Sequence, residues 1–151
     1  MKIGFDLDGV LRTLDLFPLR ICKEISDDYD MMKWYYMLLK PELNPFMFLS
    51  EDDEAYIISM QKDRDRELTE KWLRKFLPTI TAHVLVHNWN ASDWKAQNSE
   101  KINNEWSSQK ATKIKELGLE VFFEDDPQVV KQLRELCPET KIIQYGGRLL
   151  A

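Results

Sequence analysis

The chain has 151 residues, a formal net charge of −5, and 44% hydrophobic and 31% charged residues. This length and composition indicate one globular domain and exclude a disordered chain, because enough apolar surface is present to form a core. The acidic balance makes nucleic acid an unlikely partner, since binding its backbone needs a net basic face, although a local basic pocket for one phosphate is compatible with it.

The N-terminal stretch from Lys2 to Leu11 predicts a short strand that delivers two carboxylates into a glycine turn. Asp6 and Asp8 are two residues apart, so strand alternation would place both on the same face. Gly9 lets the backbone turn sharply where a side chain would collide. Two carboxylates so close repel each other unless a cation or a shared proton relieves them, and Mg²⁺ suits oxygen ligands best. A strand followed by a plain acidic turn fits the same residues.

Residues 13–53 interrupt this pattern and predict a small helical insertion between the first two strands. Apolar residues recur there at mixed helical spacing, Pro41 and Pro45 punctuate the segment, and an acidic cluster at 50–53 ends it. Its aromatic and methionine residues fit either a small core under the insertion or a lid that contacts an apolar part of a substrate.

The rest of the chain alternates between strand and helix patterns. The later strands are expected at residues 55–59, 83–87, 119–123 and 141–145. The helices are expected at 61–76, weakly at 93–103, at 110–117 with Gly118 as C-cap, and at 129–136. Five strands separated by helices predict an α/β fold, with a three-layer, Rossmann-like arrangement around a five-stranded parallel sheet. Residues 1–151 are therefore expected to form a single domain.

Polar residues cluster where these strands end, and sites in open α/β sheets form beyond the carboxyl ends of the strands. Strand one ends in Asp6 and Asp8, strand two in Ser59, and strand four in the acidic triplet 124–126, while Lys110 begins the preceding helix. Carboxylates suit a cation, and a hydroxyl group with a lysine suits an anion. This edge of the sheet therefore fits a metal-bound phosphoryl group.

These residues resemble the motifs of the haloacid dehalogenase-like (HAD) superfamily, whose members are mostly phosphatases. The resemblance runs from residue 1 to about residue 146, apart from the insertion. It consists of two runs and two single residues: Asp6-Leu7-Asp8-Gly9-Val10, Phe123-Glu124-Asp125-Asp126-Pro127, Ser59 and Lys110. The segment from Ile57 through Thr69 to Leu73 is also similar to small 5′-nucleotidase-like members.

The resemblance implies a role for each catalytic position. Asp6 would be the nucleophile that becomes an aspartyl-phosphate, and Asp8 would be the general acid and base. Ser59 would donate to a phosphate oxygen. Lys110 would pair with both Asp6 and the phosphate.

The resemblance also implies a magnesium site. Mg²⁺ would be held by Asp6, by the backbone carbonyl of Asp8 and by Asp125, with Glu124 or Asp126 beside it. From the residues alone, a cation and a lysine would lower the pKa of Asp6 and keep it ionised for attack.

Several of these positions have structural alternatives. Ser59 also fits a residue that simply ends a strand, and one acid of the triplet fits an N-cap for a helix that begins near Pro127. Three other lysines compete with Lys110 for the same motif, because the preceding loop makes the alignment loose: Lys95, Lys101 and Lys113.

Five other residues bear on sites and compartment. His83 and His87 would face the same side of one strand, but no third ligand joins them, so they are interpreted as structural, or His87 as a residue at the rim of the crevice. Arg12 fits either a substrate contact or a role on the surface of the insertion. Cys22 and Cys137 lack close spacing and are expected to be free thiols, although a disulfide between them fits the sequence.

The resulting hypothesis is a Mg²⁺-dependent phosphomonoester hydrolase that acts on a small phosphorylated metabolite or nucleotide, covered by a cap at residues 13–53. A non-catalytic domain that binds a phosphorylated ligand or a partner protein, and a phosphatase for nucleic-acid ends, are the alternatives. No apolar run of signal-peptide or membrane-span length is present, so a soluble, cytoplasmic protein is expected. The sequence does not indicate the oligomeric state.

Overall fold

The computed structural model describes residues 1–12, 49–87 and 99–145. These residues form a five-stranded sheet with three α-helices, in the order β1 (Lys2–Phe5), β2 (Glu54–Lys62), the 3-10 helix η2 (Asp63–Asp65), α3 (Arg66–Phe76), β3 (Thr81–His87), α5 (Ser99–Leu117), β4 (Val121–Glu124), α6 (Pro127–Leu136) and β5 (Lys141–Gln144). All strands pair in parallel, in the order β3-β2-β1-β4-β5. The predicted α/β fold with a five-stranded parallel sheet is confirmed.

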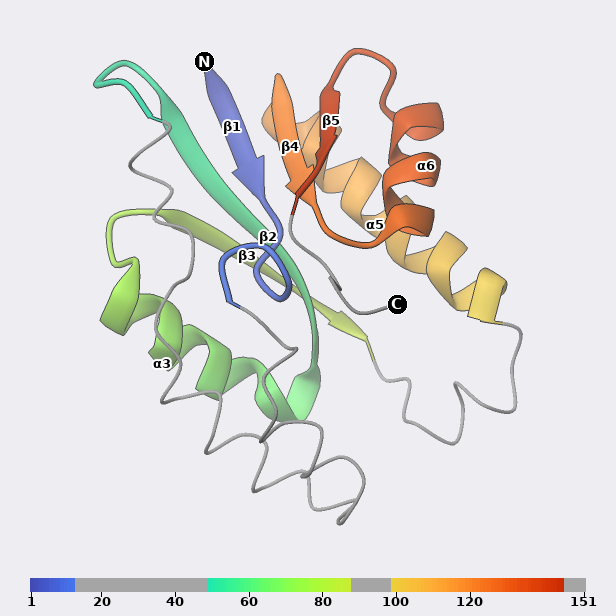
Figure 1. Cartoon of the computed structure of the whole chain (residues 1–151). Helices are drawn as coiled ribbons and strands as arrows, with labels where there is room; N and C mark the ends of the chain where they lie inside the picture. Colours follow the sequence, from blue (N-terminus) through green and yellow to red (C-terminus); the bar gives the residue numbers. More distant parts are fainter. Residues whose placement is uncertain (13–48, 88–98, 146–151) are drawn as a thin grey trace.

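The sheet is the middle of three layers (Figure 1). Helix α3 covers one face, and helices α5 and α6 cover the other. Successive residues of β2 point to opposite faces, so Ile57 packs with Trp72 of α3, whereas Ile58 packs with Ile114 of α5. Because both faces are buried, the strands read as nearly continuous apolar runs rather than alternating ones.

Strand β1 occupies the centre of the sheet, between β2 and β4. Phe5, its last residue, aligns with Ile57 on one side and with Phe123 on the other. A side chain at Gly4 would overlap the side chains of Leu119 and Phe122, so this position needs a glycine. The residues that follow β1 therefore emerge next to the end of β4.

The predicted end of the second strand is wrong. β2 continues through Met60 and Gln61 to Lys62, and α3 begins only at Arg66, after η2. Polar residues at the end of the strand read as the beginning of a helix, but the neighbouring strand β3 pairs with them as far as His87. Ser59 consequently lies within a strand rather than at its end.

The prediction of two short helices before the fourth strand is also wrong. One helix, α5, runs from Ser99 to Leu117, and Lys110 lies well inside it rather than at its beginning. The sequence signal is weak because the buried side of α5 carries polar groups. Asn103 and Ser107 of this helix hydrogen-bond to glutamines of α6, which satisfies them.

Other expectations concern single residues and the insertion. Gly118 has a φ of 65° directly after α5, as expected for a C-cap glycine. Cys137 is a buried free thiol that donates to the carbonyl oxygen of Ala111, while Cys22 lies outside the described residues. The cap insertion predicted at 13–53 also lies outside them, except for residues 49–53. Among the described helices, none is both long and apolar enough to span a bilayer.

Candidate functional site

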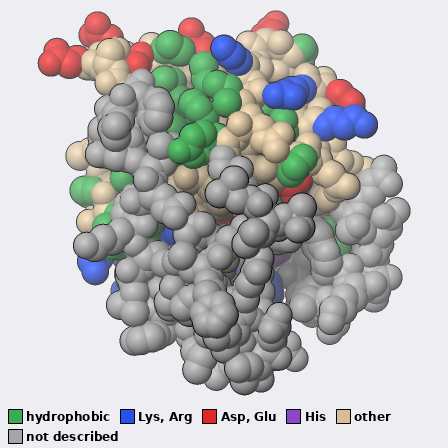
Figure 2. All heavy atoms as spheres, in the orientation of Figure 1, with side chains coloured by type: hydrophobic (Ala, Val, Ile, Leu, Met, Phe, Trp, Pro, Cys, Tyr) green, Lys and Arg blue, Asp and Glu red, His purple; other side chains and the backbone are tan. Residues whose placement is uncertain are grey.

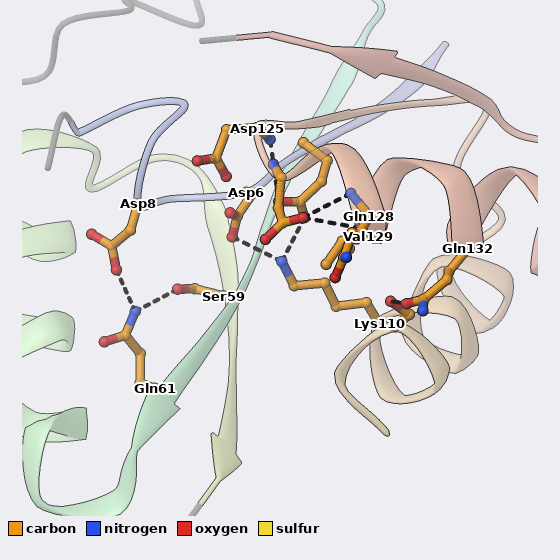
Figure 3. Close-up of polar contacts among 12 residues, drawn as sticks. Asp6, Asp8, Ser59, Gln61, Lys110, Asp125, Gln128, Val129 and Gln132 are labelled. Atoms are coloured by element: carbon orange, nitrogen blue, oxygen red, sulfur yellow. Dashed lines mark hydrogen bonds and ion pairs between the residues drawn. The ribbon is translucent and has the colours of Figure 1, made fainter. Parts of the chain in front are cut away.

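Three carboxylates meet where β1 and β4 end. Asp6 directly follows β1, Glu124 ends β4 and Asp125 follows it. The backbone N–H of Asp6 donates to the carbonyl oxygen of Phe123 at 2.8 Å, which continues the pairing of the two strands into the site. One oxygen from each of the three carboxylates lies within 4.8 Å of the other two. Asp6 and Asp125 are thus close enough to share one cation (Figure 3).

Lys110 reaches this cluster from α5. Its Nζ lies 2.6 Å from Glu124 Oε2 and 3.2 Å from Asp6 Oδ1, and all three side chains are buried. The alternative lysines compare poorly. Lys113 pairs with Glu116 on the same helix, Lys101 is exposed, and Lys95 lies outside the described residues. Of the described lysines, Lys110 is therefore the one that fits the predicted position.

Lys110 compensates the negative charge of Glu124 better than that of Asp6. Burial alone would raise the pKa of Glu124, but the close Lys110 ammonium lowers it below its ordinary value. Burial and the nearby Glu124 charge raise the pKa of Asp6 well above its ordinary value, against the opposing effect of Lys110. Burial alone would lower the pKa of Lys110, but the two carboxylates raise it. Without a metal ion, Asp6 is therefore the acid whose negative charge is least compensated.

Asp125 carries a second uncompensated charge. Burial, and to a smaller extent the neighbouring Glu124, raises the pKa of Asp125 to about 7. The turn after β1 is shaped around this side chain, because Gly9 has a φ of 88° and a Cβ atom there would overlap the Asp125 carboxylate. Three hard oxygen donors, two of them with raised pKa values, fit a divalent cation that would relieve their repulsion.

Glu124 and Asp126 are held in other ways. Glu124 Oε1 accepts from the backbone N–H groups of Asp125 and Asp126, at 3.2 and 3.3 Å, while its other oxygen binds Lys110. Asp126 is the N-cap of α6, and its Oδ1 accepts from the backbone N–H groups of Gln128 and Val129. The N-cap interpretation of the acidic triplet therefore applies to Asp126. Asp125 and Glu124 are the residues of the triplet that belong to the three-carboxylate cluster.

Asp8 forms a separate part of the site. Its side chain does not belong to the three-carboxylate cluster. It accepts from Gln61 (Figure 3) and also contacts Arg12. Arg12 donates from Nε at 2.7 Å, and its terminal nitrogen lies 2.6 Å from the same oxygen, Oδ1. The guanidinium also lies over the Trp72 ring, 5.0 Å from its centroid. Arg12 is thus a buried support for Asp8 rather than a residue of the protein surface.

Ser59 and Gln61 lie on the same face of β2. Ser59 is 1% exposed, and its Oγ accepts from Gln61 Nε2 at 2.6 Å; the same nitrogen donates to Asp8 Oδ2 at 2.8 Å. The sequence pattern places Gln61 in a helix and so does not indicate its position in the site. The signal that could have found it is strand alternation, since residues 59 and 61 share a face when the strand extends past Ser59.

The two histidines on β3 lie apart from this chemistry. Among the described residues, the cluster that could hold a metal ion consists of carboxylates and includes neither histidine. His87 stacks at an angle against Trp106, with ring centroids 4.5 Å apart. Burial lowers the pKa of His83 and brings that of His87 to about 4, so both are neutral at physiological pH. Their interpretation as structural residues agrees with this environment.

The chain is similar to proteins of the Pnkp1/Rnl/Hen1 RNA repair complex in two solved structures. The first has a TM-score of 0.59 and 21% identity, over 95% of this chain and 42% of the solved chain. The second has a TM-score of 0.58 and 20% identity, over 98% of this chain and 47% of the solved chain. Our chain thus spans less than half the length of the solved chains that it matches. No family model and no curated protein matches it. At this identity the likeness establishes the fold.

The expectation that nucleic acid is an unlikely partner was wrong, because both similar structures belong to an assembly that includes RNA repair proteins. The net charge of −5 is a property of the whole chain. In Figure 2, basic and acidic side chains are interspersed around the upper rim of the described surface. Net charge therefore says little about whether one phosphate group can enter a local site.

Proposed function

We propose that the chain is a Mg²⁺-dependent phosphoric monoester hydrolase of the haloacid dehalogenase-like type, with Asp6 as its nucleophile. The observation that carries this proposal is the position of Asp6, which lies 3.2 Å from Lys110 and shares a cation-sized cluster with Asp125 and Glu124. A carboxylate beside a buried ammonium and a divalent cation site is suited to attack a phosphorus atom whose negative charge must be neutralised.

The reaction would proceed in two steps. An Asp6 carboxylate oxygen attacks phosphorus, the bond from phosphorus to the ester oxygen breaks, and that oxygen takes a proton from Asp8. Water then attacks the phosphorus of the aspartyl-phosphate, and Asp8 takes one proton of that water. The bond between Asp6 and phosphorus breaks, which restores the carboxylate and releases inorganic phosphate. Ser59 and Lys110 would hold the phosphate oxygens in both steps.

Asp6 and Asp125 are the residues that would hold the cation, together with the backbone carbonyl of Asp8. Glu124 lies in the same cluster, but its oxygens already accept from Lys110 and from two backbone N–H groups, so its main role would be to fix Lys110 and Asp125. The bound ion would supply positive charge to the phosphoryl group and keep Asp6 ionised. Mg²⁺ is our candidate because the donors are all hard oxygen atoms.

The proposed substrate is a phosphomonoester at the end of an RNA strand. This choice is supported by the likeness to proteins from an RNA repair complex, which shares the fold over 95% of this chain. Residues 1–151 would form one domain, with the insertion predicted at residues 13–53 as the cap that limits entry; residues 13–48 of that insertion lie outside the described part.

The test uses the purified chain with oligoribonucleotides that carry a 3′- or a 5′-phosphate, a free nucleoside monophosphate and p-nitrophenyl phosphate. Phosphate release should require Mg²⁺, should stop with EDTA and should be highest for a terminal RNA phosphate. Asp6→Asn should abolish release without unfolding the protein. The matched control, Glu139→Gln, changes an exposed acid in the turn before β5 and should keep full activity.

A wild type that is inert toward every phosphomonoester would refute the hydrolase. Full activity in Asp6→Asn would place the nucleophile elsewhere. A clear preference for the free nucleotide would refute the RNA substrate while leaving the hydrolase intact.

A further inference from the structure

The proposed acid–base residue Asp8 is held at both carboxylate oxygens by side chains from different parts of the chain. Arg12 binds Oδ1 with two nitrogens, at 2.6 and 2.7 Å, and Gln61 donates to Oδ2 at 2.8 Å. The Asp8 side chain is 23% exposed, whereas that of Arg12 is 3% exposed and Gln61 is buried. An accessible carboxylate is thus fixed on a buried support, which is an arrangement expected for a group that meets a substrate.

The orientation of the Gln61 amide is determined by its neighbours. Its Oε1 accepts from the Thr69 hydroxyl at 3.3 Å, on the side away from Asp8, and Thr69 is buried on α3. A flipped amide would bring a carbonyl oxygen against the Asp8 carboxylate and leave the Thr69 donor without its acceptor. The NH₂ group therefore faces the site, and its two hydrogens serve two acceptors, Asp8 Oδ2 and Ser59 Oγ.

The two acceptors have complementary chemical tasks. In the proposed reaction, Ser59 binds an oxygen of the phosphoryl group, while Asp8 exchanges a proton with the leaving oxygen on the same phosphorus. One planar NH₂ group joins them, so it fixes the distance between the residue that holds the phosphate and the residue that protonates the leaving group (Figure 3).

The hydrogen bonds also distinguish the two oxygens of Asp8. Oδ1 accepts from Arg12 Nε at 2.7 Å and also forms a 2.6 Å ion pair with a terminal nitrogen of the same guanidinium. Oδ2 accepts one bond from Gln61, which leaves one lone pair directed elsewhere. Proton exchange with a substrate would therefore use Oδ2, the oxygen that Gln61 orients.

We propose that Gln61 is a positioning residue that ties Asp8 to Ser59 and aims Asp8 Oδ2 at the leaving oxygen of the substrate. This inference rests on the proposed hydrolase function. It predicts that loss of the Gln61 amide impairs protonation of the leaving group rather than binding of phosphate or stability of the fold.

The test compares two esters whose leaving groups differ in their need for a proton. p-Nitrophenolate leaves as a stable anion, whereas the alkoxide of glycerol 2-phosphate needs protonation. Gln61→Met keeps the length of the side chain and removes both hydrogen-bonding groups. It should lower kcat/KM about 10- to 100-fold for glycerol 2-phosphate and less than about 3-fold for p-nitrophenyl phosphate, with the loss in kcat rather than KM.

Two further variants make the test specific. Gln109→Met changes an exposed glutamine of α5 and should match the wild type with both esters. Thr69→Val removes the anchor of the Gln61 amide without touching Asp8, so it should show the same ester-dependent loss, smaller in size. It also serves as the test if Gln61→Met fails to fold. In an Asp8→Asn background, Gln61→Met should add less than about 2-fold, because both changes remove the same proton transfer.

The outcomes separate this inference from the proposed function. An active wild type with an inert Asp6→Asn variant, but with equal losses for both esters in Gln61→Met and Thr69→Val, would overturn the role of Gln61 alone. Additive losses in the double variant would do the same. A wild type that is inert toward both esters and toward terminal RNA phosphates would overturn the proposed function, and this inference with it.

Discussion

Replacing Lys110 by methionine tests the charge balance of the buried cluster. The change removes an ammonium that lies 2.6 Å from Glu124 and 3.2 Å from Asp6, while keeping most of the apolar stem. At an effective dielectric constant of about 20, these pairs correspond to attractions of roughly 6 and 5 kcal/mol. The attraction to Asp6 is the less important one, because burial and the nearby Glu124 charge raise the pKa of Asp6 and so oppose its charged form.

The net cost is smaller than these attractions. The variant no longer buries an ammonium ion, which returns several kcal/mol, and the abandoned carboxylate can take up a proton. Breaking a buried pair by removing one partner usually costs about 3–5 kcal/mol, which is the expected loss in the free energy of unfolding here. This is a large part of the total of about 5–15 kcal/mol that a domain possesses.

The loss should depend on pH in a direction set by Glu124. Lys110 lowers the pKa of Glu124 in the folded wild type. Ionised Glu124 therefore stabilises the fold at pH values above 4.5, its ordinary pKa, and this stability is lost as the pH falls through the lowered pKa of the folded protein. In Lys110→Met, burial is no longer opposed and raises the pKa of Glu124 instead. The variant should therefore be most destabilised near pH 8 and less so near pH 5, where the buried carboxyl accepts a proton.

The assay is urea denaturation followed by circular dichroism, at both pH values and with EDTA present. Lys113→Met is the matched control, because this lysine lies on the same helix and forms a partly exposed pair with Glu116 at 2.7 Å. That control should change stability by less than about 1 kcal/mol. A Lys110→Met protein as stable as Lys113→Met at pH 8 would show that the reasoning about the buried charges is mistaken.

Four further predictions concern the metal, the turns around it and the N-cap of α6. The affinity for Mg²⁺ should rise between about pH 5 and pH 8, because binding must displace protons from Asp125, with its pKa of about 7, and from Asp6. Titration calorimetry in two buffers measures the released protons. An affinity that does not change with pH would contradict the assignment of these two residues as ligands. Metal-free protein should correspondingly lose stability as the pH rises from about 4 through about 7, because both acids have raised pKa values in the fold. Gly9→Ala should cost about 1–3 kcal/mol and abolish stabilisation by Mg²⁺ in thermal melts, because the new Cβ displaces the Asp125 carboxylate, whereas Gly118→Ala, also at positive φ but facing open space, should keep that response. Asp126→Ala should lose about 1 kcal/mol in urea denaturation through the missing N-cap of α6, and Asp126→Asn should not.

The fold could be predicted because the apolar strands of a doubly covered sheet are visible without tertiary information. The runs around Ile57 and Phe122 are buried on both faces, so their composition alone marks them. Helix α5 could not be predicted as one element, because its inward side carries Asn103 and Ser107. Their partners are Gln128 and Gln132 of α6, 25 residues further along the chain, and only the folded structure brings them together.

The same distinction applies to the candidate site. Asp6, Glu124 and Asp125 could be placed together because they end or directly follow neighbouring strands, and the rule for parallel sheets brings such ends together. The residues that support Asp8 could not be predicted from the sequence. Arg12 is buried by its pairing with Asp8 and by the Trp72 ring. Gln61 enters the site because pairing with β3 continues β2 for three residues beyond Ser59. Both effects arise from packing rather than from local sequence.

The charges of the cluster explain why net charge was a poor guide to partners. Three of the acids that make the chain negative lie together at Asp6, Glu124 and Asp125, and the first two of them are buried. Lys110 and one divalent cation would carry three positive charges against their three negative ones, so the loaded site would be neutral. A terminal phosphate would then meet a cation, an ammonium group and the Ser59 hydroxyl rather than three carboxylates. For an enzyme that binds only the end of a strand, this local balance determines whether a phosphate is accepted, because the rest of the nucleic-acid backbone need not be neutralised.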